Sequence, residues 1–363
     1  MHKPISLPPA VRTGYVRPLD IKQGCVDMAH GSGGRLMAQL IRELFLRYLG
    51  NDYLGQGDDG AVLPANGEGA LVMATDAHVV SPLFFPGGDI GCLSVHGTIN
   101  DVAVMGAKPL YLSAAFILEE GFPLADLERI VQSMAQAAQA AGVRVVTGDT
   151  KVVERGKGDG VFITTTGVGV IPPGQPRFSG RAAEVGDVIL VSGTLGDHGM
   201  AIMAERESLG FSGVDNQSPI VSDTAALHGL IAALVTSGAD IHVLRDPTRG
   251  GLATTLNEIA QQSGVGMMLE EKSLPVKPAV NAACELLGLD PLYVANEGKL
   301  VVICAAKDAE QVLAVMREHP LGKAAARIGT VHADDHQFVQ MTTAFGGRRI
   351  VDWLSGEQFP RIC

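Results

Sequence analysis

Apolar residues follow two different spacings along this chain, and these spacings predict alternating strands and helices. Short apolar-rich runs at 70–74, 110–118, 143–146 and 161–170 predict strands of a sheet. Apolar residues three and four positions apart predict helices over 91–104 and 123–142, the second opening at a proline and closing at a glycine. The first half of the chain therefore combines a sheet with helices.

The second half repeats this mixture after Ile171-Pro172-Pro173-Gly174, which we take as the domain boundary. The same spacings predict strands at 188–191, 265–269, 299–305, 329–331, 337–341 and 349–353, and helices at 200–205, 223–235, 246–262, 276–287 and 308–318. Because strands and helices interleave without a Rossmann fingerprint, we expect two α+β domains. We divide the chain into an N-terminal arm with a glycine-rich loop, an N-terminal domain, a C-terminal domain and a mobile tail, at 1–35, 36–173, 174–350 and 351–363.

Length, charge and cysteine spacing argue against several classes of protein. A chain of 363 residues exceeds what one compact core usually holds, in agreement with two domains. The net charge of −11 argues against a nucleic-acid surface, since phosphate contacts need clustered lysine and arginine. The five cysteines form no C-x-x-C pair, which argues against a disulfide framework or zinc ribbon and favours a cytoplasmic location. No apolar run approaches the length of a membrane span, so we expect no membrane association.

Aspartates recur beside glycines or at the ends of apolar runs. These positions are Asp58, Asp59, Asp76, Asp101, Asp149 and Asp246. Carboxylates at the ends of elements can be gathered around a hard cation, and magnesium usually takes a few of them together with substrate phosphates. An aspartate beside a glycine is also a common turn residue, so each position alone admits both interpretations. Lys151 follows one of these aspartates by two residues and could neutralise a phosphate or pair with that carboxylate.

A glycine-rich turn, His30-Gly31-Ser32-Gly33-Gly34, precedes a helical pattern that starts near residue 36. Free backbone N–H groups at such a turn can hold a phosphate. The turn is not a Walker loop, because no Gly-Lys-Ser/Thr follows it. A hinge before a helix explains the turn equally well.

The sequence ends with Pro360-Arg361-Ile362-Cys363. A terminal thiol can swing on its tail, and C-terminal residues are usually poorly ordered unless they are docked. The adjacent α-carboxylate disfavours the thiolate, whereas Arg361 favours it. Taken alone, the tail is better explained as a frayed end than as a functional group, and its thiol matters only if something upstream needs it.

Several motifs occur together in one order along the chain. They are Asp58-Asp59-Gly60-Ala61-Val62, Thr75-Asp76, the run from Ile99-Asn100-Asp101 to Lys108-Pro109, Gly148-Asp149-Thr150, Asp246-Pro247-Thr248-Arg249-Gly250-Gly251-Leu252 and Asn296-Glu297-Gly298. In this order they resemble the ATP-binding superfamily of aminoimidazole ribonucleotide synthetase (PurM) and selenophosphate synthetase, over nearly the whole chain. The glycine-rich turn, the continuation Lys151-Val152-Val153 and the terminal cysteine are similar to the HypE family of hydrogenase maturation proteins.

The resemblance implies a two-domain PurM-like fold and a reaction that gives the tail a purpose. HypE-like proteins receive a carbamoyl group on the C-terminal cysteine from the carbamoyltransferase HypF. With ATP they dehydrate this thiocarbamate to a thiocyanate, and the cyanide passes to iron on the HypC–HypD complex during assembly of NiFe-hydrogenase. The resemblance also implies a homodimer in which the N-terminal sheets pair around a two-fold axis.

The resemblance also implies roles for individual residues. Cys363 becomes a tethered substrate carrier, Lys151 neutralises the γ-phosphoryl group, and Asp101 or Glu297 accepts a proton, with His30 as a further possibility. A loop carboxylate paired with Lys299 is the alternative interpretation of Glu297. The residues expected to hold ATP are Gly31, Ser32, Gly33, Gly34, Asp58, Asp59, Asp76, Asn100, Gly148, Asp149 and Thr150. Those expected to hold Mg²⁺ are Asp59, Asp76, Asp101 and Asp246.

Two other functions fit the same motifs. Another ATP-using synthetase or kinase of this superfamily would treat Cys363 as incidental. A non-catalytic thiol carrier would use the nucleotide only to bury or expose the tail. Mass spectrometry of the carbamoylated protein with Mg-ATP separates these alternatives, because only a dehydratase removes water at the cysteine.

Overall fold

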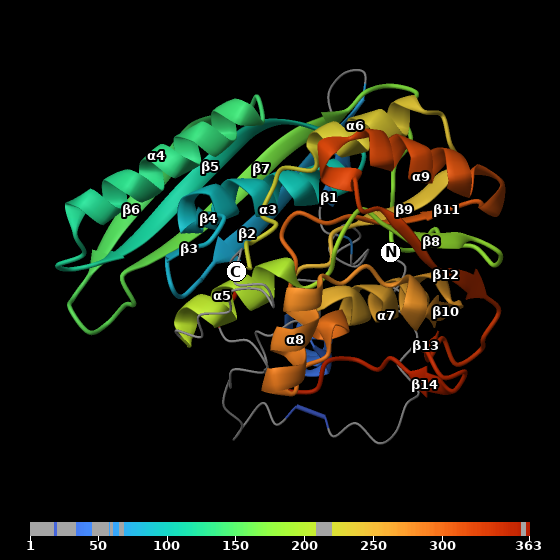
Figure 1. The fold of residues 1–363 in the computed structure, drawn as a ribbon. Coiled ribbons are helices and arrows are strands. Elements are labelled where there is room, and N and C mark those ends of the chain that lie inside the picture. The colour runs from blue at the N-terminus through green and yellow to red at the C-terminus, as the bar shows by residue number, and fades with distance from the viewer. Residues whose placement is uncertain are drawn as a thin grey trace.

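The structure is a computed structural model that describes residues 18–19, 34–45, 58, 61–64, 69–207, 220–356 and 361–363. Two large mixed sheets with their helices form two domains that lie side by side (Figure 1). The predicted α+β class and the division into two sheet-based halves are therefore confirmed.

The N-terminal domain is a five-stranded sheet in the order β1-β2-β7-β5-β6. Its strands are β1 (Ala61–Pro64), β2 (Ala70–His78), β5 (Lys108–Glu119), β6 (Arg144–Val153) and β7 (Val161–Ile171). Strands β5 and β6 are parallel and the other pairs are antiparallel. Helices α3 (Ile90–Val104) and α4 (Leu124–Ala140) cover one face of this sheet (Figure 1). Alternate residues of β7 are buried, so the opposite face of the sheet is left open in one chain.

Short elements precede and connect these strands. Helix α1 (Arg35–Leu40) continues into a π-helical turn (Ile41–Phe45), and a small ribbon of β3 (Phe84–Phe85) and β4 (Gly88–Asp89) leads into α3. Asp89 caps α3, its carboxylate accepting hydrogen bonds from two backbone N–H groups of the first turn.

The C-terminal domain is a seven-stranded sheet in the order β14-β13-β10-β12-β8-β11-β9. Its strands are β8 (Val188–Val191), β9 (Ile241–Arg245), β10 (Gly266–Glu270), β11 (Val301–Cys304), β12 (Ala326–His332), β13 (Val339–Thr342) and β14 (Arg348–Ile350). Helices α6 (His228–Thr236) and α9 (Ala309–Glu318) pack on one face and α7 (Gly251–Ser263) on the other. Strand β8 is apolar at all four positions because helices cover both faces of the sheet, so its alternate residues pack into two different cores.

The remaining helices lie where the domains meet or join the strands. Helices α5 (Asp197–Arg206) and α8 (Pro278–Leu287) pack against each other, and α5 also contacts β3 (Figure 1). Among the described residues, four 3₁₀ turns belong to this domain: η4 (Glu271–Ser273), η5 (Pro291–Tyr293), η6 (Ala306–Asp308) and η7 (Pro320–Gly322).

Helix α3 occupies the centre of the molecule and is buried almost all round. It contacts the N-terminal sheet on one side and α6 and β9 of the C-terminal domain on the other. An apolar helix without a polar face is expected in such a position. Its buried side chains are therefore placed to link the two domains.

Two predicted elements differ from the structure. The helix expected at 223–235 begins only at His228, because the preceding residues cross between the domains and use their backbone for tertiary hydrogen bonds to the Asn100 side chain. The strand expected to end at Val146 continues to Val153, since β5 pairs with it along its whole length.

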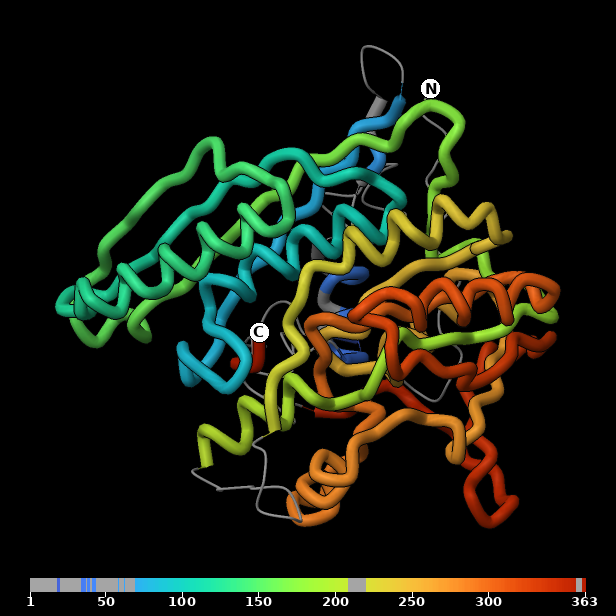
Figure 2. The backbone as a smooth tube through the Cα atoms, turned by 45° about the horizontal axis from the view of Figure 1, so that its top comes forward, coloured from blue at the N-terminus to red at the C-terminus, as the bar shows by residue number. Residues whose placement is uncertain are grey.

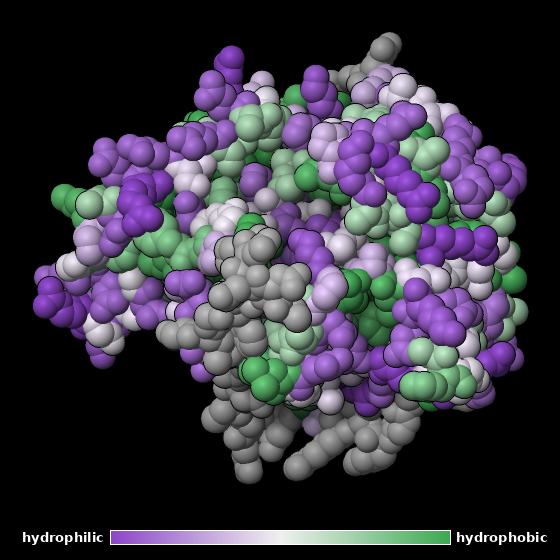
Figure 3. All heavy atoms as spheres, viewed as in Figure 1, coloured by the Kyte–Doolittle hydropathy of each residue, from purple (hydrophilic) through white to green (hydrophobic). Residues whose placement is uncertain are grey.

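The surface mixes polar and apolar side chains over both domains on the face shown in Figure 3. In the described part of the chain, no helix combines the length and apolar character that crossing a bilayer requires.

Candidate functional site

The last three residues are docked between the two domains. Ile362 forms an antiparallel bridge with Val80, the Val79 N–H donates to the backbone oxygen of Cys363 (2.8 Å), and the Ser81 N–H donates to the oxygen of Arg361 (3.1 Å). The Ile362 side chain is 3% exposed and belongs to the core shared by α3, α5 and α8. Figure 2 shows this end of the chain beside the loop that follows β2. The sequence predicts a mobile tail, and the structure shows its tip in a docked position.

The thiol of Cys363 is partly buried and lies among charged side chains. Burial raises the pKa of this thiol well above its usual range, the guanidinium of Arg249 lowers it, and the carboxyls of Glu297 and Asp76 raise it further. The docked cysteine is therefore a neutral thiol at physiological pH. It is placed as a group to be acted upon, since nucleophilic attack would need the thiolate.

Glu297 is the carboxyl that faces this thiol, and its side chain is only 3% exposed. Burial raises the pKa of Glu297 well above its usual range, and the nearby carboxyls of Asp76, Asp246 and Asp223 raise it further. Its Oε1 atom is buried and has no hydrogen-bond partner among the described residues. Once ionised, a buried carboxyl with a raised pKa is a stronger base than a solvated one, and its unpaired oxygen suits a proton acceptor.

A buried ion pair holds the backbone of Glu297 in place. Lys299 Nζ lies 3.0 Å from Asp223 Oδ2, and the Asp223 carboxylate also accepts from the N–H groups of Glu297 (3.1 Å) and Gly298 (3.4 Å). The alternative interpretation, in which Glu297 pairs with Lys299, is therefore wrong. Lys299 is paired with Asp223 instead, and the Glu297 carboxyl is left facing the thiol.

Arg249 is a site residue that the assignment from the sequence left out. Proximity to Cys363, whose thiolate form Arg249 would stabilise, is the largest influence that raises the pKa of this guanidinium; burial lowers the pKa, and Asp76, Glu297 and Asp101 raise it further. Its Nη2 atom lies 3.9 Å from Asp76 Oδ1. The sequence signal for Arg249 is its place in the motif Asp-Pro-Thr-Arg-Gly-Gly, just before the start of helix α7. Gly251 permits that start, because a Cβ at this position would lie 2.5 Å from the carbonyl oxygen of Leu292.

A cavity of about 210 Å³ opens beside Asp76 and Arg249. Three of the four predicted metal ligands line it, namely Asp76, Asp101 and Asp246. Within the described ranges, no group of three or more His, Cys, Asp or Glu side chains is close enough to hold a metal ion by itself. The fourth predicted ligand, Asp59, lies outside the described residues.

Several predicted nucleotide ligands have structural contacts in this chain. Asn100 is fully buried, donates to the carbonyl oxygens of Ala225 and Glu297 and accepts from the Leu227 N–H. Asp58 accepts from the hydroxyl of Ser179 and the N–H of Gly180. A Cβ at Gly34 would lie 2.3 Å from the carbonyl oxygen of Leu354. Contact of these three residues with a nucleotide stays a prediction, and His30, Gly31, Ser32 and Gly33 lie outside the described residues.

The Gly148-Asp149-Thr150-Lys151 segment does not reach this site within one chain. Asp149 and Lys151 pair with Ala115 and Ile117 of β5, so they stand on the open face of the sheet, and their side chains are 66% and 74% exposed. Asp76 lies on the opposite, helix-covered face, three strands away or roughly 14 Å at the usual strand spacing. The ion pair between Lys151 and Asp149 (3.5 Å) is therefore separate from Cys363.

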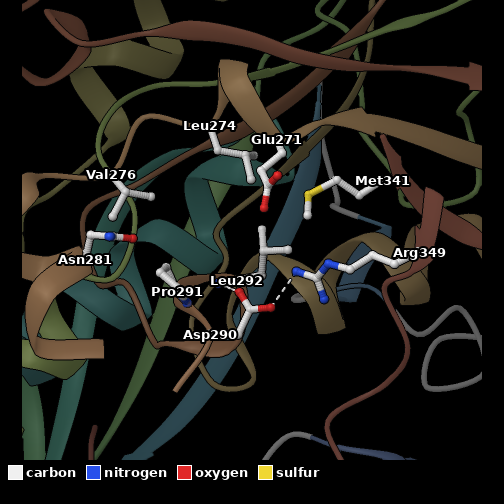
Figure 4. A pocket seen from close by; sticks show the side chains of 9 residues that line it. All are labelled: Glu271, Leu274, Val276, Asn281, Asp290, Pro291, Leu292, Met341 and Arg349. Atoms are coloured by element: carbon white, nitrogen blue, oxygen red, sulfur yellow. Dashed lines mark hydrogen bonds and ion pairs between the residues drawn. The ribbon is translucent and has the colours of Figure 1, made fainter. Parts of the chain in front are cut away.

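A second cavity of about 280 Å³ lies in the C-terminal domain, between α8, η5 and the strands β13 and β14 (Figure 4). Asp290 and Arg349 form an ion pair at its edge. Its lining contains none of the residues predicted to act. We therefore place the candidate site at the docked tail and the acidic cavity.

Comparison with known proteins agrees with this placement. The chain matches the family models for the N-terminal domain of AIR synthase related proteins over residues 57–171 and for their C-terminal domain over residues 184–342. It is 67% identical to the carbamoyl dehydratase HypE of Cupriavidus necator over 353 residues, which cover 97% of this chain and 99% of that protein. The chain belongs to the HypE family.

Solved structures of HypE proteins have the same fold. A HypE chain in a crystal structure of a HypE–HypF complex matches with a TM-score of 0.81 at 50% identity, covering 87% of this chain and 99% of that one. A HypE structure in complex with ATP matches with a TM-score of 0.77 at 51% identity, covering 93% and 99%. The PurM-like, two-domain fold expected from the motifs is thus confirmed.

Proposed function

We propose that this chain is an ATP-dependent carbamoyl dehydratase that converts an S-carbamoyl group on its own Cys363 into a thiocyanate for the iron centre of NiFe-hydrogenase. The observation that carries this proposal is the docked position of the Cys363 thiol. It lies against the unsatisfied carboxyl of Glu297 and beside Arg249, which also lines the acidic cavity. The HypE relatives named above support the same reaction.

The reaction turns the carbamoyl oxygen into a leaving group. This oxygen attacks the γ-phosphorus of ATP, the new O–P bond forms as the bond to the β-phosphate oxygen breaks, and ADP leaves. The nitrogen gives up one proton as the C=N bond forms. Cleavage of the C–O bond then releases phosphate, and loss of the second N–H proton leaves S–C≡N on Cys363.

Glu297 is the residue that we propose to accept a proton from the carbamoyl nitrogen. Its carboxyl lies against the thiol that would carry the carbamoyl group, and its Oε1 atom has no hydrogen-bond partner among the described residues. Arg249 offsets negative charge that develops on the oxygen side of the group. Asp101, the other proton acceptor predicted from the sequence, lines the cavity and stays the weaker candidate.

The cavity residues fit a magnesium nucleotide. Asp76, Asp101 and Asp246 offer the oxygen donors that magnesium prefers, and the lack of a preassembled cluster within the described ranges suits a cation held mainly by phosphates. When bound, magnesium would neutralise the charge of the β- and γ-phosphates. The three carboxylates would then fix where the nucleotide sits relative to Cys363.

A second copy of the chain completes the site in this proposal. Met73, Val168 and Tyr111 form one cross-strand row on the open face of the N-terminal sheet, and Met73 and Tyr111 are 45% and 49% exposed. Apolar side chains on an open sheet face favour burial against a partner. Pairing of two such faces would also carry Asp149 and Lys151 to the nucleotide of the other copy.

The expected partners follow from the same reaction. The carbamoyl donor would be HypF, which a HypE relative binds in a solved complex, and the cyanide acceptor would be the HypC–HypD complex. The cytoplasmic location expected from the cysteines stays a prediction.

The decisive experiment follows the mass of the C-terminal peptide. The full-length protein is carbamoylated at Cys363, either by HypF or chemically with potassium cyanate, and is then given Mg-ATP. We expect loss of one water at Cys363 together with ADP, and no nitrile in a Cys363→Ala variant that still binds ATP. Labelled nitrile from Cys363→Ala would overturn the proposal.

The same measurement distinguishes the alternative functions. If neither ATP nor its analogues alter the carbamoyl adduct on Cys363, the non-catalytic thiol carrier is the only function that remains. A synthetase or kinase would instead hydrolyse ATP undiminished in Cys363→Ala when it is offered its own substrate.

A further inference from the structure

The backbone pairing of the tail does not by itself aim the thiol. The bridge at Val80 and the two flanking hydrogen bonds would form with almost any side chains, since they join backbone groups. At Arg361, the Arg206 guanidinium donates to the carbonyl oxygen (2.9 Å), but this contact is exposed. The contact that fixes the residue before Cys363 must therefore lie at Ile362.

One side chain holds the backbone of Ile362 from the interior. His198, at the start of α5, is fully buried, and its Nε2 atom lies 2.6 Å from the Ile362 carbonyl oxygen. Its Nδ1 atom lies 2.7 Å from Ser222 Oγ. The ring of Phe85 packs edge-on against the imidazole, with the centroids 5.5 Å apart. Both ring nitrogens are thus occupied and the ring is held in one orientation.

The partners fix the tautomer of His198. A carbonyl oxygen can only accept, so the Nε2 atom must carry the hydrogen that it donates to Ile362. Burial lowers the pKa of His198, so the ring is neutral and its Nδ1 atom accepts from the Ser222 hydroxyl. The Ser222 oxygen in turn accepts from the Thr224 N–H (3.1 Å). Hydrogen bonds therefore run in one direction from residues 222–227, the crossing segment between the domains, to the tail.

The crossing segment ties this contact to the proton acceptor. Ser222 orients His198, and the next residue, Asp223, accepts from the Glu297 N–H (3.1 Å). A single short segment therefore positions both the carbonyl before Cys363 and the backbone of Glu297. Such an arrangement sets two reacting groups against each other, and an error of about 1 Å can cost roughly a hundredfold in rate.

We propose that His198, oriented by Ser222, is a positioning residue that holds the Ile362 carbonyl and so aims the Cys363 thiol, or its carbamoyl adduct, at Glu297. This proposal rests on the proposed dehydratase function for its catalytic consequence. The docking contact itself is independent of that function. The tail must leave its docked position to meet a carbamoyl donor. The hydrogen bond from His198 to Ile362 then breaks, and it forms again when the tail returns.

The first test measures docking without any catalysis. Full-length protein is alkylated with iodoacetamide, and modification of Cys363 is followed on the C-terminal peptide by mass spectrometry. His198→Phe keeps a ring against Phe85 but removes the donor, and we expect alkylation of Cys363 to rise roughly tenfold. His198→Gln restores a donor near the Nε2 position and should bring the rate back close to wild type.

Matched controls separate loss of the hydrogen bond from general loosening. His242→Phe removes a histidine that pairs with Asp187 in the C-terminal domain, and should leave the alkylation rate unchanged. Ser222→Ala keeps His198 but removes the hydroxyl that fixes its tautomer, and should raise the alkylation rate of Cys363 by less than His198→Phe does. If His198→Phe fails to fold, Ser222→Ala carries the test alone. Equal rates for His198→Phe and His198→Gln, or no rise in Ser222→Ala, would overturn the proposal.

The second test measures the aim of the docked group. Each variant is carbamoylated with potassium cyanate, and the single-turnover loss of water at Cys363 is timed at saturating ATP. We expect His198→Phe to lower this rate at least tenfold, with unchanged ATP affinity and with recovery in His198→Gln. An undiminished rate in His198→Phe would contradict the positioning role. Absence of dehydration in the wild-type protein would instead refute the proposed function and leave the alkylation result standing.

Discussion

Glu297 and Lys151 are assigned to the same reaction, yet the chain buries one and exposes the other. The Glu297 side chain is 3% exposed, and all the groups that surround it here belong to one chain. They are the ion pair of Asp223 and Lys299, which holds its backbone, and the docked Cys363. The Lys151 side chain is 74% exposed on an edge strand, with Asp149 as its ion-pair partner. The surroundings of Glu297 are thus complete within one chain, whereas in our proposal Lys151 needs the surface of a second copy to meet the nucleotide.

The largest expected effect tests whether Lys151 acts on the tail of the other copy. Cys363→Ala and Lys151→Ala should each lose more than a hundredfold of the dehydration rate on their own. In a purified heterodimer of the two variants, one site would combine an intact tail with an intact lysine. We expect about half of the wild-type rate there, since one of two symmetric sites is restored. A heterodimer as inactive as its parents would place Lys151 in the same chain as its substrate.

The next effect concerns the buried half. Glu297→Gln should lower the dehydration rate roughly a hundredfold to ten-thousandfold, because it removes the proposed base and keeps the shape. The variant should also be more stable than wild type at neutral pH. The folded-state pKa of Glu297 is raised, so its contribution to stability is complete below its unfolded value of 4.5 and is lost as the pH rises. The gain in stability should therefore vanish near pH 4, as chemical denaturation across pH can show.

A smaller effect tests the frame of Glu297. Lys299→Met leaves Asp223 buried without its cation and should cost about 3–5 kcal/mol of unfolding free energy. Burial opposes ionisation of Asp223, but the ion pair with Lys299 and the hydrogen bond from the Glu297 N–H outweigh it and lower the pKa of this carboxyl. The stabilisation is therefore present above the unfolded pKa of 3.8 and is lost as the pH falls. Lys307→Met, which breaks an exposed pair with Asp240, is the control and should change stability little.

The smallest effect belongs to the exposed half. Asp149→Asn removes an exposed ion pair with Lys151 and should change the unfolding free energy by at most about 1 kcal/mol. If this segment binds the nucleotide of a second copy, ATP affinity should nevertheless fall. Calorimetry of both quantities checks this separation. A large loss of stability without any change in ATP affinity would give Asp149 a structural role instead.

Most helices and strands were predictable because their apolar patterns are local. The run of β8 and the face of α4 required no long-range information, and the ordered motifs were enough to indicate the family and the importance of Cys363. The start of α6 was not predictable. Asn100, over a hundred residues away in sequence, draws the backbone of Ala225 and Leu227 into tertiary hydrogen bonds.

The sequence by itself predicted most of the elements, the two domains and a set of candidate site residues, from which Arg249 was missing. The tertiary structure decided which of them meet: Arg249, Glu297 and Cys363 come together only because the crossing segment and the docked tail bring separate elements to one point. It also decided that Lys151 faces away from Cys363. An edge strand exposed on both sides has no apolar alternation to show its orientation, so only the pairing register with β5 fixes the face on which that lysine stands.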